Sequence, residues 1–286
     1  MGYPTPENKA EEGAHGGSTL WAANGPLLLW HHFPRIVEKY LEVQYNTMVL
    51  SVIDLDHKLL NQKIRALDTD VLLSNCCGQR FIAAGMREKH ITIDGTPGNA
   101  LGAYLDGAVI EVNGNAQDAV GDTMNDGTII IHGNIGDAAG YAMRGGKIYV
   151  QGDAGYRAGI HMKAYKEKVP VMIIGGKAGS FLGEYQAGGV IIVLGLSQNQ
   201  RNIVGNFPCT GMHGGKMILR GNTDGISFPH NVCVAAASAL DREEIQAELA
   251  QYCQVFGLSV NEIMDSEFTV VTPDSKNPYK QMYVAN

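Results

Sequence analysis

Short runs of apolar, β-branched residues recur along the middle of the chain, and each run ends at a glycine. The runs are HITIDG, AVIEVNG, TIIIHG, KIYVQG, VIIVLG and KMILRG. Valine and isoleucine favour strands, and a glycine directly after such a run is typical of a closing turn. No segment between these runs has room for a helix of about ten residues or more, which excludes the helical crossovers of α/β folds.

The glycines between the runs repeat with a period of 19 residues, interrupted by one interval of 24. One series is Gly95, Gly114, Gly133, Gly152, Gly176 and Gly195, and a second, seven residues later, is Gly102, Gly121, Gly140, Gly159 and Gly183. Gly78 and Gly85 have the same seven-residue offset, so we expect the repeat to begin there. Strands at this period without helices predict an all-β core, a right-handed parallel β-helix of about seven coils.

The flanking sequences predict a small α/β cap before the coils and a helix after them. Four segments are expected: an irregular or disordered extension (1–47), a cap (48–77), the β-helix (78–221), and a C-terminal helix and tail (222–286). Met48 is an alternative start of translation. In the cap, a short helix should place Leu59, Leu60, Ile64 and Leu67 on one side.

The C-terminal helix is predicted over Asp241–Phe256, with acidic residues in its first turn and Gly257 after its end. We expect it to cover the open end of the stack, because exposed edge strands need protection. The segment EFTVVTP predicts a strand after it.

The thirteen glycines of the repeat are interpreted as structural rather than as a phosphate site. No G-x-G-x-x-G opens a helix, and no G-x-x-x-x-G-K-[ST] is present. A corner that recurs once per coil requires positive φ angles and leaves no space for a Cβ atom, and glycine satisfies both conditions.

Composition limits the classes of function. The 286-residue chain has 36 glycines and a net charge of −7 without a basic stripe, which argues against nucleic-acid binding. No apolar run reaches the roughly 18 residues of a membrane span, so no membrane contact is expected. Five cysteines form no disulfide framework and no C-x-x-C, and we expect a cytoplasmic location.

Candidate contacts cluster where the repeat is interrupted. The 24-residue coil contains an insertion within Met162–Pro170, and Arg144 and Lys163 share one position in successive coils. The predicted interface or anion contacts are Arg144, His161, Lys163, Tyr165, Lys166 and Lys168. The alternatives are a solvated bulge and neutralisation by neighbouring carboxylates. Asp118 and Asp137 also share a position, and we favour exposed turn residues over a metal site there. No catalytic set and no metal site are predicted.

The repeat resembles the GXGXG β-helix domain at the C-terminal end of the glutamate synthase large subunit. The same domain occurs as a stand-alone chain and as one of the separate subunits of formylmethanofuran dehydrogenase. The strongest likeness is in GTPGNALGAYLDG, GNAQDAVGDTMNDG, GYRAGIHMKAYKEKVPVMIIGGKAGSFLGEYQAGGVIIVLG and the tail EFTVVTP, and it covers about residues 48 to 286.

The resemblance implies a non-catalytic scaffold in an oxidoreductase complex of glutamate biosynthesis, which transfers the glutamine amide nitrogen to 2-oxoglutarate. Its partners would be a glutaminase-type amidotransferase and an FMN-binding synthase subunit. FMN and the iron–sulfur cluster would belong to those partners, and no cofactor would be bound by this chain. Scaffolds of formylmethanofuran dehydrogenase or N-methylglutamate synthase complexes are alternatives. An independent β-helix enzyme acting on acidic polysaccharide would have only the Arg144 and Lys163 pair to use.

Overall fold

The computed structural model describes residues 47–196, 202–221 and 223–274. The chain divides into two compact units, Met1–Gln44 and Tyr45–Asn286, and the described residues all belong to the second. The predicted N-terminal extension, apart from Thr47, and the final residues of the predicted tail lie outside the described part.

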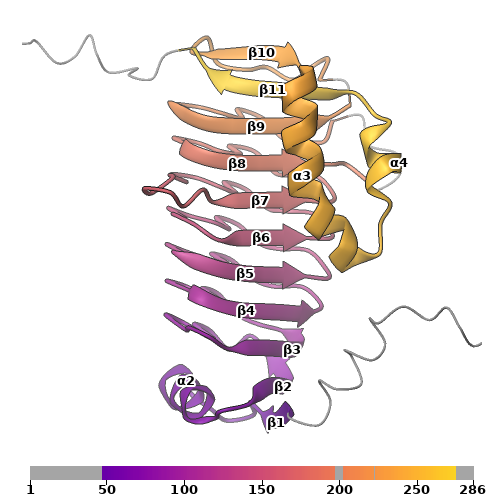
Figure 1. The fold of residues 1–286 in the computed structure, drawn as a ribbon. Helices are drawn as coiled ribbons and strands as arrows, with labels where there is room; N and C mark the ends of the chain where they lie inside the picture. The colour runs from indigo at the N-terminus through magenta and orange to yellow at the C-terminus, as the bar shows by residue number, and fades with distance from the viewer. Residues whose placement is uncertain (1–46, 197–201, 222, 275–286) are drawn as a thin grey trace, which may run out of the picture. The chain divides into compact units, whose positions relative to one another are not determined.

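All the described strands belong to one eleven-stranded sheet, in the order β1-β2-β3-β4-β5-β6-β7-β8-β9-β11-β10 (Figure 1). The strands are β1 (Thr47–Ser51), β2 (Asp70–Cys77), β3 (His90–Thr96), β4 (Asp106–Asn113), β5 (Asp126–Ile131), β6 (Lys147–Val150), β7 (Val171–Ile174), β8 (Ala187–Val193), β9 (Gly214–Arg220), β10 (Val232–Ala236) and β11 (Phe268–Pro273). Strands β1 to β9 pair in parallel in chain order. The predicted parallel β-solenoid is confirmed, with about eight turns where the glycine count predicted seven.

Pairing between turns aligns apolar residues into continuous buried columns. In one column, each of seven residues is the register partner of the next: Ile91, Ile110, Ile129, Ile148, Met172, Ile191 and Met217. All seven side chains have no exposed surface. The core is therefore a ladder of like residues, each stacked on the one 19 to 26 positions earlier.

Each turn of the stack contains a corner in which alternate residues adopt left-handed φ angles. In one such corner, Ala100, Gly102 and Tyr104 have φ angles of 65°, 63° and 57°. The second glycine series occupies the middle position. At Gly121, for example, a Cβ atom would lie 2.6 Å from Cδ1 of Ile148, so both the angle and the space favour glycine.

The first turn departs from the predicted register. The partner of Gly95 is Cys76, and the N–H of Gly102 donates to the carbonyl of Ile82, which aligns Gly102 with Ala83. Gly78 and Gly85 therefore lie two residues beyond the glycine columns, and the expectation that the repeat begins there was wrong. Cys76 and Ala83 occupy the aligned positions in this turn, and Ala83 adopts the same left-handed backbone as the glycines, with a φ of 58°.

The predicted cap is continuous with the solenoid. Strand β1 pairs in parallel with β2, and helix α2 (His57–Ala66) connects them, with Asp56 as its N-cap. Leu60 and Ile64 are fully buried, whereas Leu59 is 41% exposed, contrary to the prediction that it shares their side. The buried Asn61 takes part of that side, because its amide bonds to the Phe81 carbonyl and the Ala83 N–H.

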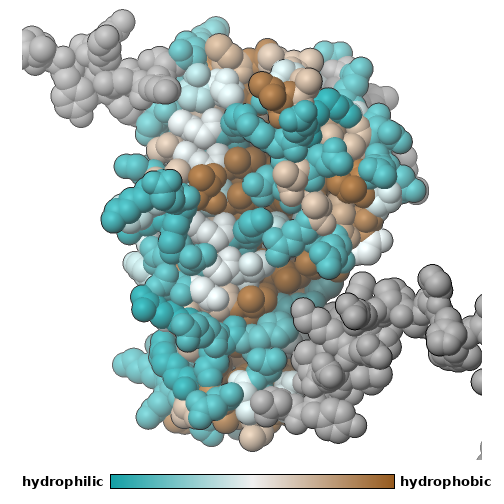
Figure 2. Space-filling model, in the orientation of Figure 1, coloured by the Kyte–Doolittle hydropathy of each residue, from teal (hydrophilic) through white to brown (hydrophobic). Residues whose placement is uncertain are grey.

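The C-terminal helix lies along the side of the stack, and the prediction that it covers the open end was wrong. Helix α3 (Ala239–Phe256) begins at a capping box formed by Ser238 and Asp241 and ends at Gly257, which has a φ of 64°. Its residues Ile245, Leu249 and Tyr252 form a second core with the outer faces of β5 to β9. Figure 1 shows the helix lying across the side of the stack. In the same view, Figure 2 shows hydrophobic surface beside this helix. A short helix, α4 (Val260–Met264), leads into β11.

Candidate functional site

His161 lies at the left-handed corner of its turn, between two tyrosine rings. Its φ is 56°, and its N–H donates to the carbonyl of Glu184 in the next turn at 2.9 Å. The imidazole stacks on Tyr185 with centroids 5.2 Å apart, and it meets Tyr141 edge-on at 5.7 Å. All three rings are exposed, so an aromatic row crosses three successive turns on the surface.

Arg144 and Lys163 are neighbours in successive turns, as their spacing predicts. The N–H of Lys163 donates to the carbonyl of Met143 at 2.9 Å, which is the parallel bond that aligns Lys163 with Arg144. Both side chains are exposed. Within residues 47–196, 202–221 and 223–274, no carboxylate forms an ion pair with either. Two cations thus face solvent side by side.

The predicted insertion folds as a small hairpin beside these cations. Tyr165 and Lys168 exchange two backbone hydrogen bonds of 3.0 Å, and Lys166 turns the chain with a φ of 55°. The Lys166 ammonium lies 5.4 Å from the centre of the Tyr165 ring, within the range of a cation–π contact. The insertion is therefore an ordered projection.

Lys168 differs from the other cations because its charge is compensated. Its Nζ donates to Asp126 at 2.7 Å and lies 3.9 Å from Asp106. The hydrogen bond from Lys168 lowers the pKa of Asp126. Lys168 thus ties the hairpin to β4 and β5, and Arg144, Lys163 and Lys166 are the cations that face outward.

Asp118 and Asp137 accept hydrogen bonds from backbone N–H groups of the following turn. Asp118 Oδ1 accepts from the N–H of Asp137 at 2.9 Å, and Asp137 Oδ1 accepts from the N–H of Tyr156 at 2.8 Å. Both side chains are exposed. Each carboxylate therefore acts as a cap between turns.

A second ladder, in which side-chain oxygens again accept from backbone N–H groups of the next turn, was not predicted from the sequence. Asn115 accepts from the N–H of Asn134 at 2.8 Å, Asn134 accepts from Asp153 at 2.7 Å, and Asp153 accepts from Lys177 at 2.8 Å. The signal was available, because three of these four side chains are Asn or Asp at the 19-residue spacing.

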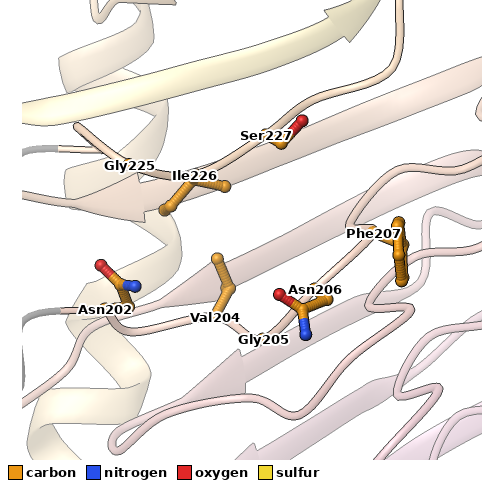
Figure 3. Close-up of a pocket in the computed structure, with 8 residues that line it drawn as sticks. All are labelled: Asn202, Val204, Gly205, Asn206, Phe207, Gly225, Ile226 and Ser227. Atoms are coloured by element: carbon orange, nitrogen blue, oxygen red, sulfur yellow. The ribbon is translucent and has the colours of Figure 1, made fainter.

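Two surface pockets accompany the stack. One, of about 340 Å³, is lined by Asn202, Asn206, Ser227 and apolar neighbours, and Figure 3 shows Val204 and Ile226 on its two sides. The other, of about 350 Å³, lies between the hairpin and α3, with Lys168 and Gln251 among its lining residues. Among the residues that the structure describes, the first has no charged lining residue, and the second includes Lys147 and the Lys168–Asp126 pair.

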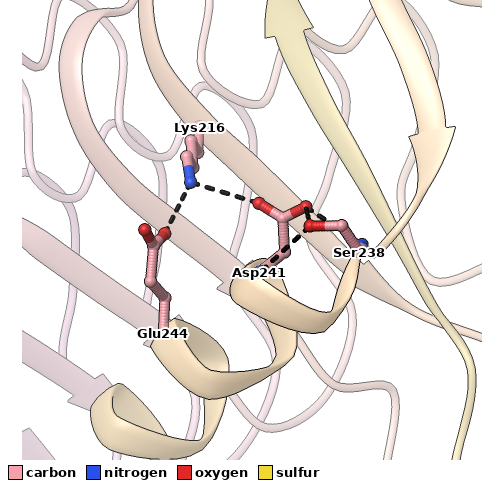
Figure 4. A network of polar contacts seen from close by, with 4 residues as sticks. All are labelled: Lys216, Ser238, Asp241 and Glu244. Carbon is pink, nitrogen blue, oxygen red and sulfur yellow. Dashed lines mark hydrogen bonds and ion pairs between the residues drawn. The ribbon is translucent and has the colours of Figure 1, made fainter.

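Polar contacts fix α3 on the sheet. Lys216 of β9 bonds to Asp241 at 3.2 Å and to Glu244 at 2.5 Å (Figure 4). The bond to Glu244 raises the pKa of Lys216, and the bond from Ser238 lowers that of Asp241. These residues stabilise the seam between helix and sheet.

The buried thiols of the protein are poorly suited to act as nucleophiles. Burial raises the pKa of Cys76 to about 11 and that of Cys209 to about 12, so both remain protonated thiols at neutral pH. Across the described ranges, no group of three or more His, Cys, Asp or Glu side chains could hold a metal ion. In the same ranges, no helix has the length and apolarity needed to cross a membrane.

Comparisons with known proteins show the family of the chain. The chain is 41% identical over 250 residues to Uncharacterized protein MJ1350 of Methanocaldococcus jannaschii, an alignment covering 82% of this chain and 96% of that protein. The model of the GXGXG motif family matches residues 45–274, which include the whole stack, α3 and β11. The chain therefore belongs to the GXGXG-motif family.

Proposed function

We propose that this chain is a non-catalytic β-helix scaffold in a glutamate synthase-type oxidoreductase complex. It would pack between a glutaminase-type amidotransferase and an FMN and iron–sulfur synthase unit. The observation that carries the proposal is the match of the GXGXG family over residues 45–274. In glutamate synthase, this family's domain accompanies the catalytic units.

The exposed corner supports a docking role. Arg144 and Lys163 lack carboxylate partners within the described residues, although the chain has a net charge of −7. They lie near the aromatic row of Tyr141, His161 and Tyr185. Aromatic rings and arginine are enriched at protein interfaces, and unpaired cations favour a partner surface that presents carboxylates.

The test is purification of the intact complex from the native cell through a tag on this chain. We expect co-purifying glutaminase-type and FMN-binding chains and a yellow-brown absorbance spectrum. Molybdenum or tungsten with an amidohydrolase chain would instead assign the protein to a formylmethanofuran dehydrogenase-type complex. A colourless protein purified alone at low ionic strength would refute the scaffold role.

Charge reversal tests which face docks. The double variant Arg144→Glu with Lys163→Glu should reduce the recovered partner chains at least tenfold, because it places two carboxylates against an acidic surface. Lys177→Glu is the matched control. Lys177 is also exposed, but it aligns with Asp153, ten residues before Lys163 in the 19-residue coil, and so lies away from the corner. Equal recovery from both variants would rule out this face.

A further inference from the structure

Strand β10 forms an open edge at the C-terminal end of the sheet. Among the strands that the structure describes, it is the last in the sheet order, and its one strand neighbour is β11 (Figure 1). Its sequence is VCVAA, and the residues from Cys233 to Ala236 are all exposed. Edge strands are normally protected by charge, proline, a bulge or a covering segment, and β10 itself has no charge and no proline.

The hydrogen bonds to β11 show which backbone groups of β10 face outward. The pairs Asn231–Asp274 and Ala237–Phe268 are joined by hydrogen bonds of 3.1 and 2.9 Å. Bonded pairs alternate along an antiparallel ladder, so Cys233 and Ala235 also bond to β11. Val232, Val234 and Ala236 therefore direct their N–H and C=O groups away from the sheet. No partner for these groups lies among the described residues outside the strands.

We propose that two copies of this chain associate by antiparallel pairing of their β10 strands. A two-fold axis at Val234 places Val234 opposite itself and Val232 opposite Ala236. Each of these pairs is then a hydrogen-bonded pair, and every outward N–H and C=O of Val232, Val234 and Ala236 is satisfied in a single register.

A second copy fits this edge for reasons of symmetry and chemistry. The three outward residues are centred on Val234, so the strand is complementary to itself without an unpaired group. The contact is isologous and closes at two copies. Cys233 and Ala235 would meet across the axis as small, uncharged neighbours, and no like charges would face one another.

The first test is the mass of the full-length chain in solution, measured by light scattering across a dilution series. We expect twice 30.7 kDa for the wild type and 30.7 kDa for Val234→Pro. Proline removes only an outward N–H at this position, so the β10–β11 ladder is kept, and circular dichroism should be unchanged. Val234→Thr, which keeps the N–H and the β-branched shape, should remain dimeric.

The second test is the register. In the proposed pairing, position 235 of one copy lies opposite Cys233 of the other at a non-hydrogen-bonded site, where side chains are closest. In a Cys77→Ser background, Ala235→Cys should give a covalent dimer on oxidation, and Ala236→Cys, which faces Val232, should not. A monomeric wild type would overturn the proposal, including the case in which residues 275–286 of the same chain cover the edge. A dimer unaffected by Val234→Pro, or cross-linking by Ala236→Cys alone, would overturn it equally.

Discussion

The corners of the stack favour glycine for two reasons, the left-handed backbone and the lack of space for a Cβ atom. A comparison of Gly121 with Gly85 distinguishes them. Both glycines have left-handed backbones, with φ angles of 68° and 63°. A methyl group on Gly121 would lie 2.6 Å from Cδ1 of Ile148, whereas no atom of the described chain lies within 4 Å of the same methyl on Gly85. Gly85→Ala therefore introduces backbone strain alone, and Gly121→Ala adds a steric clash to it.

The expected losses of unfolding free energy for these variants follow from this difference. Left-handed strain costs about 1–2 kcal/mol, offset by about 0.4–1 kcal/mol from the stiffer unfolded chain, so Gly85→Ala should cost about 1 kcal/mol. Overpacking adds about 1–3 kcal/mol, so Gly121→Ala should cost about 2–4 kcal/mol. Ile148→Val removes the clashing Cδ1 at a cost of about 0.5–1.5 kcal/mol.

A double-mutant cycle measured by urea unfolding with circular dichroism tests the reasoning. Gly121→Ala combined with Ile148→Val should be more stable than the sum of the single changes predicts, by about 1–2 kcal/mol. Ala83, which occupies the aligned position in the first turn with a φ of 58°, shows that alanine can adopt this backbone. Additive costs, or equal costs for Gly85→Ala and Gly121→Ala, would refute the assignment of the difference to Ile148.

Three further predictions concern single contacts. Asn134→Ala should lower the free energy of unfolding by about 1 kcal/mol, because the N–H of Asp153 loses its acceptor. Asn134→Asp keeps an oxygen at that position and should lower it less. Denaturant midpoints that fall equally for both variants would contradict the ladder. Because the pKa of Asp126 is lowered in the folded protein, its contact with Lys168 stabilises the fold above pH 3.8, the ordinary pKa of an aspartate. This stabilisation is lost as the pH falls through the folded-state pKa of Asp126. Because both side chains are nearly half exposed, the difference in unfolding free energy between wild type and Lys168→Met should stay below about 1 kcal/mol at pH 7. It should vanish once the pH is below the folded-state pKa of Asp126, and a pH-independent difference would exclude the ion pair as its source. Iodoacetamide at pH 8 should label exposed Cys77 and spare buried Cys76 until the protein is unfolded, as peptide mass spectrometry can show, and equal labelling of the folded protein would contradict the burial of Cys76.

The solenoid was predictable because both the glycines and the isoleucines of the chain recur with its period. Isoleucines recur at the same 19-residue spacing as the glycines, and both are fixed by stacking on the previous turn. The first turn was misread because Cys76 and Ala83 stand where later turns have glycine. This turn packs against β1 and α2 instead of against another glycine-bearing turn, so its corner does not follow the repeat.

The position of α3 was harder to predict because capping signals define the ends of a helix and do not define what it covers. A sequence signal for its location existed in the strands. All four residues of β7, VMII, are buried, and β8 contains VIIV. A strand apolar on both faces requires a cover on its outer side. Tyr149 and Ile173 are buried under α3 for this reason.

The candidate site was predictable only where it follows the register. Arg144 and Lys163 are adjacent because they share a position in successive turns. The pairing of Lys168 with Asp126 spans 42 residues and depends on how the hairpin folds back over the stack. No local pattern specifies that direction, so the sequence grouped Lys168 with Arg144 and Lys163, which have no carboxylate partner among the described residues.

The placement of α3 also limits where a partner can bind. The helix seals the outer faces of β5 to β9 through Ile245, Leu249 and Tyr252, and Lys216 and Lys147 hold its polar edge. The residues of those strands that pack under α3 are therefore not available to another subunit. The corner with His161 remains open, and backbone hydrogen bonds between turns hold its aromatic row. Tyr141 accepts from the N–H of Thr123 in the previous turn, and the N–H groups of His161 and Tyr185 donate to the turns that follow them. A rigid surface loses little entropy on binding, which is the property that a scaffold between two catalytic units requires.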